Sequence, residues 1–154
     1  RRCGAGMTAV PGGWRFEKQP LRAVDIDLAD CPDLGPILMV LGLFCEGETV
    51  IRNAGRLRVK ESDRIAAMQQ EVEKLGGRIE AEGGTVRVRG ASLHGAPDLA
   101  GHNDHRVVMA LTVAALAADV PVCIQEAEAV RKSWPDFFAR MQQLGAEVKT
   151  DGTT

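Results

Sequence analysis

Six charged side chains crowd into the stretch GRLRVKESDRIAAM, residues 55–68. Three of them, Lys60, Glu61 and Arg64, lie at the start of an amphipathic helix that the sequence predicts over residues 63–75. The first turn of a helix presents unpaired N–H groups and a partial positive charge, so lysine and arginine are unfavourable there unless an anion binds. The stretch therefore predicts a site for phosphate or carboxylate groups.

Acidic and basic side chains recur at the starts of three other predicted helices, over residues 36–45, 106–117 and 135–144. These side chains are Asp33, Asp104, His105, Arg106 and Lys132. Capping is an alternative explanation for Asp33, for Asp104 and for the Ser62–Asp63 pair, because such side chains often accept hydrogen bonds from first-turn N–H groups. A lone histidine in a first turn is, by itself, often structural. Capping does not explain the basic side chains at successive helix starts.

Composition and charge exclude several classes of protein. The net charge of −2 over 154 residues gives no reason to expect a nucleic-acid or membrane surface. The apolar runs GPILMVLGLFC and RVVMALTVAALAA are too short to span a membrane. Four scattered cysteines, with no CxxC pair, argue against a zinc site or a disulfide scaffold and favour the cytoplasm. The electropositive site must therefore arise from local clustering.

An internal repeat organises the chain. KLGGRIEAEGG at 74–84 is echoed by QLGAEVKTDGT at 143–153 and more faintly by RCGAGMTAVPGG at 2–13, with Gly76, Gly145 and Gly4 at equivalent points. The segments between these marks predict an α/β fold built from β-α-β-α-β-β units. We expect residues 1–19 to be the tail of a truncated unit, 20–90 a second unit and 91–154 a third. On this division residue 1 lies inside a unit, and we expect the chain to be the C-terminal part of a longer protein.

The hydrophobic pattern predicts which helices are buried. The segments 36–45 and 106–117 are apolar all round, which is typical of helices inside a domain. The helix over 63–75 has a single apolar stripe, and so does 135–144, with Phe137, Met141 and Leu144. Residues 21–28 alternate like a strand, and RIEAEGGTVRVRG, residues 78–90, predicts a hairpin around two glycines. A short strand is expected after each glycine mark.

Four ordered motifs point to a known family. DIDLADCPDLGPI, RVKESDRI, NDHRVVMAL and KSWPDFF follow one another in this chain and closely resemble the enolpyruvyl transferases, over nearly the whole chain from about residue 20 onward. The resemblance implies two domains, each of three β-α-β-α-β-β units with apolar helices inside and sheets outside. It places the active site between the domains, so an N-terminal domain absent from this chain would be its partner.

The resemblance also implies an activity. The enolpyruvyl group of phosphoenolpyruvate is transferred to the 5-hydroxyl of shikimate 3-phosphate, and phosphate is released through a tetrahedral intermediate without metal or organic cofactor. This reaction belongs to the shikimate pathway of aromatic amino acid biosynthesis. The alternative within the family is the transferase that acts on UDP-N-acetylglucosamine, although its motifs differ from KESDR and DHR. An alternative of another class is a ligand-binding domain without catalysis, and the chain alone is expected to be inactive.

Motif matching assigns a role to each candidate residue. The resemblance makes Asp33 the base for the substrate hydroxyl. Lys60 and Glu61 then handle proton transfer, with Glu61 acting at the methylene carbon of phosphoenolpyruvate. His105 donates a hydrogen bond in the same cluster. The residues expected to bind substrate are Asp33, Lys60, Arg64, Arg106 and Lys132. Arg56 departs from the family pattern, in which asparagine is common, and leaves one phosphate contact open.

Overall fold

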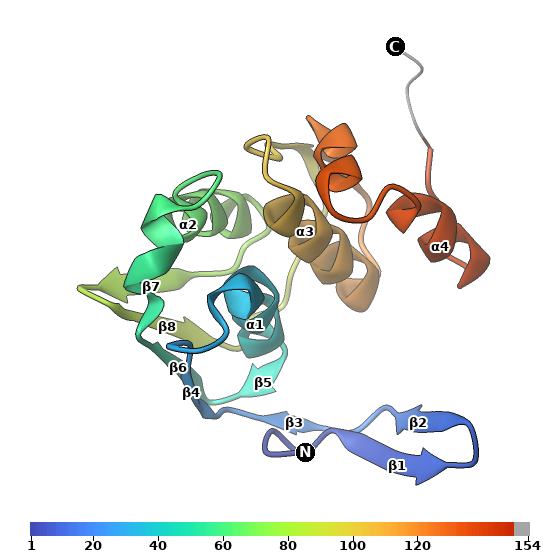
Figure 1. Ribbon diagram of the computed structural model, residues 1–154, viewed down its shortest axis with the longest axis horizontal. Helices are drawn as coiled ribbons and strands as arrows, with labels where there is room; N and C mark the ends of the chain where they lie inside the picture. Colours follow the sequence, from blue (N-terminus) through green and yellow to red (C-terminus); the bar gives the residue numbers. More distant parts are fainter. Residues whose placement is uncertain (150–154) are drawn as a thin grey trace.

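A four-stranded sheet supports one half of the molecule in the computed structural model, which describes residues 1–149 (Figure 1). Its strands are β4 (Asp25–Asp27), β6 (Glu48–Arg52), β8 (Thr85–Arg89) and β7 (Ile79–Glu82), in that order. β4 and β6 are parallel, whereas β8 is antiparallel to both of its neighbours. The last two strands form the hairpin that the sequence predicts.

Two helices connect these strands. α1 (Gly35–Leu43) follows β4 after the 3-10 turn η1 (Pro32–Leu34), and α2 (Arg64–Lys74) follows β6 after the longer 3-10 turn η2 (Ala54–Val59). Pro36 lies in the first turn of α1, where its missing N–H costs no hydrogen bond. The order β4-α1-β6-α2-β7-β8 confirms the predicted β-α-β-α-β-β unit.

The strand predicted over residues 21–28 is divided in two. Its first part is β3 (Leu21–Arg22), which pairs with β5 (Cys45–Glu46), and its second part is β4, which pairs with β6. Gly47 stands between β5 and β6 with a φ of +97°, so the partner strand turns there and the ladder is interrupted.

A second parallel pair repeats the first. β9 (Ala96–Leu99) leads through α3 (His105–Ala118) to β10 (Val122–Ile124), and the 3-10 turn η3 (Ala127–Lys132) precedes α4 (Phe137–Gln143). The short strand expected after Gly145 is not formed over residues 146–149, and its remainder, 150–153, lies outside the described residues. At the other end of the chain, β1 (Gly6–Val10) and β2 (Gly13–Glu17) form a hairpin of their own.

The three glycines that mark the repeat share one backbone conformation. Gly4, Gly76 and Gly145 have φ values of +86°, +87° and +99°. Gly76 ends α2 and Gly145 ends α4, each donating its N–H to a carbonyl of the last helical turn. A left-handed residue after a helix is most easily a glycine, which explains why the repeat is visible in the sequence. Gly4 follows a turn rather than a helix among the described residues.

The main hydrophobic core is a single cluster whose members lie between Leu28 and Ala114 in the sequence. It therefore includes residues of the predicted units 20–90 and 91–154. α1 packs against the sheet strands β6 and β8 and also against α3, so it lies between them (Figure 1). The apolar stripe of α2 is fully buried, as predicted. The mixed α/β fold class is confirmed, whereas the division at residues 19 and 90 remains a prediction.

Three apolar side chains are more exposed than their patterns predict. Ile37 of α1, Leu116 of α3 and Leu144 after α4 are 36%, 44% and 81% exposed. They lie on sides of these segments that no element within residues 1–149 covers. No helix within this range combines the length and the apolar character needed to cross a membrane.

Candidate active site

The starts of α2 and α3 lie together, and each is capped by an aspartate. Asp63 Oδ1 accepts hydrogen bonds from the N–H groups of Ile65 at 3.1 Å and Ala66 at 3.0 Å. Asp104 Oδ1 accepts one from the N–H of Arg106 at 2.9 Å. The capping alternative is therefore correct for Asp63 and Asp104.

Asp104 also joins the two helices through Arg64. Arg64 donates from Nε to Asp104 Oδ2 at 2.8 Å and from Nη2 to Asp104 Oδ1 at 3.2 Å. Ser62 Oγ donates to the same carboxylate at 3.0 Å. Both charged partners are buried, with Arg64 2% and Asp104 0% exposed. A bidentate pair of this kind fixes the orientation of both side chains and ties the α2 start to the α3 start.

Both members of this pair carry their charge at neutral pH. Burial by itself raises the pKa of Asp104, but the hydrogen bonds from Arg64, the Arg106 N–H and Ser62 outweigh it, and the pKa is lowered. Burial also opposes the charge of Arg64, yet its carboxylate partners raise its pKa further. Removing Arg64 would leave the buried charge of Asp104 without its cationic partner, and removing Asp104 would leave Arg64 paired only with the exposed carboxylate of Asp33.

Asp33 extends the network to the surface. Its Oδ1 accepts from Arg64 Nη1 at 3.0 Å and lies 3.2 Å from Lys60 Nζ. Hydrogen bonding to Lys60 lowers the pKa of Asp33, burial opposes this effect, and hydrogen bonding to Arg64 lowers the pKa further. Because the side chain is 54% exposed, this ionised carboxylate can reach a proton on a bound molecule.

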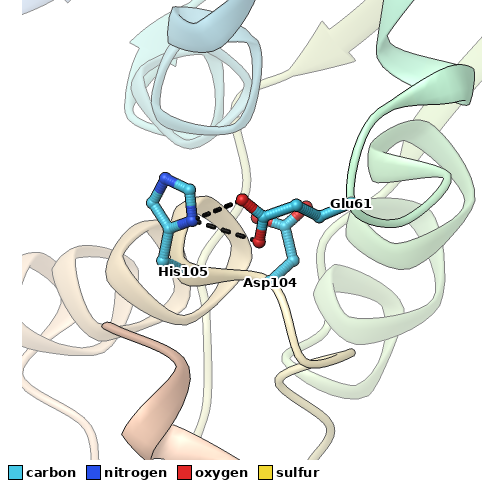
Figure 2. Close-up of side chains that lie close together, drawn as sticks. All are labelled: Glu61, Asp104 and His105. Carbon is cyan, nitrogen blue, oxygen red and sulfur yellow. Dashed lines mark hydrogen bonds and ion pairs between the residues drawn. The ribbon is translucent and has the colours of Figure 1, made fainter. Parts of the chain in front are cut away.

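A second acid–base group surrounds Glu61 (Figure 2). The carboxylate of Glu61 points at the imidazole of His105, with Nδ1 3.0 Å from Oε1 and 3.2 Å from Oε2. Lys132 Nζ lies 3.4 Å from Glu61 Oε2 and also donates to the carbonyl of Asn103. Glu61 is exposed, whereas His105 is 8% exposed. A carboxylate placed between an imidazole and an ammonium group has two neighbours through which a proton can arrive or leave.

The side chain of Arg106 lies half-buried at the start of α3. Its Nε is buried and has no hydrogen-bond partner among residues 1–149. A buried donor without a partner is unfavourable, so an anion that accepts from it would gain free energy. Arg64 is different, because three of its five N–H donors are already bound to protein carboxylates.

Ion pairs join six of the seven sequence-predicted residues in two neighbouring groups. One group contains Asp33, Lys60 and Arg64, and the other contains Glu61, His105 and Lys132. The seventh residue, Arg106, follows His105 in the first turn of α3. Arg64 and Arg106 stand in first helical turns, as predicted. Lys60 and Lys132 do not. They lie at the C-terminal ends of the 3-10 turns η2 and η3, where carbonyl groups favour a cation. The prediction that these two lysines stand at the positively charged start of a helix was therefore wrong.

Sequence analysis missed a buried glutamate that supports the site. Glu71 is 0% exposed and accepts a hydrogen bond from the Ala100 N–H at 2.8 Å. Its other oxygen lies 3.0 Å from His102 Nε2. One signal was available, because Glu71 stands next to Val72 on the side of the 63–75 helix that carries the apolar stripe, where a charge is expected only if it is paired.

Possible metal ligands occur in the same cluster. One donor atom from each of Glu61, Asp104 and His105 lies within 4.8 Å of the others. Arg64 and Lys132 already stand against the two carboxylates, and their positive charges oppose the binding of a divalent cation. The cluster is therefore better suited to proton transfer than to holding a metal.

Comparisons with known proteins identify related sequences. The sequence model described as EPSP synthase (3-phosphoshikimate 1-carboxyvinyltransferase) matches residues 1–141. A 3-phosphoshikimate 1-carboxyvinyltransferase from Methanocella arvoryzae is 45% identical over 144 residues, which are 94% of this chain and 32% of the relative. One from Clostridioides difficile is 40% identical over 124 residues, which are 80% of this chain and 28% of the relative. The chain thus spans about a third of the length of such relatives.

Solved structures agree with this fold. The enolpyruvyl transferase NikO from Streptomyces tendae matches with a TM-score of 0.78 and 25% identity, over 96% of this chain and 34% of that one. EPSP synthase from Acinetobacter baumannii matches with a TM-score of 0.74 and 25% identity, over 92% of this chain and 36% of that one. The predicted enolpyruvyl transferase fold is confirmed.

Proposed function

The chain belongs to the EPSP synthase family, and from this premise we propose that it carries one wall of an active site for enolpyruvyl transfer. The donor is phosphoenolpyruvate, the acceptor is the 5-hydroxyl of shikimate 3-phosphate, and phosphate is released. The observation that carries the proposal is the position of Glu61, whose carboxylate lies between His105 and Lys132. Asp33 and Lys60 belong to the neighbouring ion-pair network of Arg64 and Asp104, and a carboxylate oxygen of Asp104 lies within 4.8 Å of one of Glu61.

The proposed mechanism assigns a residue to each proton transfer. The acceptor hydroxyl gives its proton to Asp33 while its oxygen bonds to the central carbon of phosphoenolpyruvate. The methylene carbon takes a proton from Glu61 and becomes a methyl group, which gives the tetrahedral intermediate. Phosphate then leaves with the electrons of its bond to carbon, and a methyl proton returns to Glu61. Lys60 assists Asp33, and His105 orients Glu61.

The basic side chains are proposed to hold the anionic groups of the donor. Arg106 offers a buried N–H that has no partner within residues 1–149, and Lys132 reaches Glu61 from η3. Arg64 contributes its remaining donors and fixes Asp33. Placing cations around the acid–base groups stabilises negative charge that moves during the reaction. The assignment of these roles rests on the motif match and on the clustering of the side chains.

The complete reaction is proposed to need a second wall. Relatives of the family are about three times as long as this chain, and we infer that a further domain supplies the remaining contacts to both substrates. Closure of such a domain would exclude water and orient the reactants. The cytoplasmic location stays a prediction from the scattered cysteines.

A chimera tests the proposed function. The matching third of the Methanocella arvoryzae relative is replaced by this chain, and phosphate release from both substrates is measured for the chimera and for the chain alone. We expect turnover by the chimera and none by the chain alone, because one wall cannot position two substrates. Turnover by the chain alone, or a folded chimera that binds both substrates without reacting, would contradict the proposal.

A further inference from the structure

We propose that Glu71 is a positioning residue, which holds the loop of residues 100–104 and thereby sets Asp104, His105 and Lys132. Glu71 forms hydrogen bonds and ion pairs with Ala100, His102 and Lys74 within residues 1–149, and with none of the three side chains that it sets. The proposal rests on the proposed function only for its kinetic consequence. Its structural part stands on the contacts of the loop itself.

The loop has an unfavourable backbone. His102 and Asn103 have φ values of +54° and +48°, so two successive residues with side chains occupy the left-handed region. Asparagine and histidine tolerate this region better than most residues with side chains, but left-handed residues normally occur singly. Such a conformation persists only where surrounding groups hold it.

Glu71 holds the loop from the side of α2. Oε2 accepts from the Ala100 N–H at 2.8 Å, and Oε1 lies 3.0 Å from His102 Nε2. Lys74 Nζ lies 2.8 Å from Oε2 and supplies a charge partner. The carboxylate is thus fully buried and yet bound on both oxygens. Packing alone would favour an apolar residue at this buried position. We therefore attribute the presence of a carboxylate to its hydrogen bonds with the loop.

The opposite side of the loop is held by η3 and its flanking residues. Glu126 Oε2 accepts from the Asn103 N–H at 3.0 Å, and the Gly101 N–H donates to the Gln125 carbonyl at 3.0 Å. A Cβ on Gly101 would lie 2.5 Å from that carbonyl oxygen, so the close approach requires glycine. The loop is therefore held between α2 and the segment that leads into η3.

Hydrogen bonds from the loop fix two residues of the site, Asp104 and Lys132. The Asp104 N–H donates to the Gly101 carbonyl at 3.0 Å, which fixes the residue that caps α3 and binds Arg64. The carbonyl of Asn103 accepts from Lys132, so the loop also fixes the ammonium group beside Glu61. Loss of the Glu71 carboxylate would release Asp104 and Lys132 together.

Amide hydrogen exchange in the chain tests the structural part with Glu71→Gln. The matched control is Glu73→Gln, which removes the same charge from the exposed side of α2. We expect the amides of Asp104 and Arg106 to exchange at least about tenfold faster in Glu71→Gln, with β6 and β8 unchanged, because only local opening is affected. Unchanged exchange at Asp104 and Arg106, or equal acceleration at every amide, would overturn the proposal.

Two variants of His102 keep the test decisive if Glu71→Gln does not fold. His102→Ala removes the imidazole that binds Glu71, whereas His102→Gln keeps a side-chain N–H donor. We expect faster exchange at Asp104 and Arg106 in the alanine variant and substantial rescue in the glutamine variant. Equal exchange in the two variants would overturn the role of this contact.

Kinetics in the chimera separate this proposal from the proposed function. Glu71→Gln is expected to lower kcat by about tenfold, equivalent to about 1.4 kcal/mol, while Glu73→Gln leaves it unchanged. An inactive chimera whose chain still shows the local exchange pattern would refute only the proposed function. An active chimera in which Glu71→Gln changes neither kcat nor exchange would refute only the positioning role.

Discussion

Individual side chains at the site differ in how much freedom they have to bind a ligand. Arg64 is buried and bound to Asp104 and Asp33, so it mainly orders the site. Arg106 has a buried Nε without a partner among the described residues and is the better candidate for a direct anion ligand. The sequence alone gave both arginines the same role, because it shows their positions in the helices and not their partners.

Arg106→Ala should weaken the binding of phosphoenolpyruvate to the chimera. The loss is expected to be roughly 1.5–3 kcal/mol, because a charge-assisted hydrogen bond is removed. Isothermal titration gives the affinity directly. Arg78→Ala is the matched control, since Arg78 is exposed and, in the described part of the chain, pairs only with Glu80. Equal affinities for the two variants would show that Arg106 does not contact the donor.

Asp104→Asn should destabilise the chain at neutral pH by about 3–5 kcal/mol, because the buried Arg64 then loses its bidentate partner and keeps only the exposed carboxylate of Asp33. The pKa of Asp104 is lowered from the usual 3.8 in the folded state. Its stabilising effect is therefore complete above about pH 5 and is lost as the pH falls through the folded value. The difference in unfolding free energy between the wild type and Asp104→Asn should become smaller as the pH falls below 3.8.

Urea unfolding at pH 7 and in acid measures this difference. The exposed carboxylate of Glu82 provides the control, since Glu82→Gln should change the unfolding free energy little at either pH. A constant difference between wild type and Asp104→Asn at all pH values would contradict the ionised pair.

At the scale of elements, the repeat was predictable because it depends on backbone conformation. Gly76 ends α2 with a φ of +87°, and a Cβ there would lie 2.8 Å from the His94 ring. The 3-10 turns η2 and η3 were not predicted. They follow Asn53 and Glu126, which both adopt the left-handed conformation. Asparagine is a residue type that tolerates this conformation, whereas glutamate gives no sign of it in the sequence. This is why Lys60 and Lys132 were predicted at the starts of helices and not at the ends of 3-10 turns.

Gly76→Ala should lower the free energy of unfolding by about 1–2 kcal/mol, because an L-residue is unfavourable in the left-handed region. Gly55→Ala is the matched control, since a Cβ at Gly55 meets no atom within 4 Å and its φ is not positive. Urea unfolding of both variants measures the effect. A loss no larger than that of Gly55→Ala would contradict the account of the repeat.

At the scale of the whole molecule, the sequence patterns predicted the buried helices and the hairpin but not every exposed face. α1 and α3 are apolar all round, yet Ile37 and Leu116 are partly exposed, since no described element covers those sides. The hydrophobic pattern shows which side chains could be buried. Which of them are buried depends on the elements that pack against the helix. The site residues were predicted as a set from motifs, whereas their ion pairs, and the support from Glu71, required the structure.

The central claim is that Glu61 gives a proton to the methylene carbon of the donor and takes one back. Deuterium incorporation tests it most directly. The chimera is run in D2O with both substrates, and the vinyl group of the product is examined by mass spectrometry. We expect deuterium in the vinyl group for the unaltered chimera and turnover about 10²–10⁴-fold slower for Glu61→Gln, with donor affinity retained. A Glu61→Gln chimera that incorporates deuterium at the unaltered rate would contradict the account.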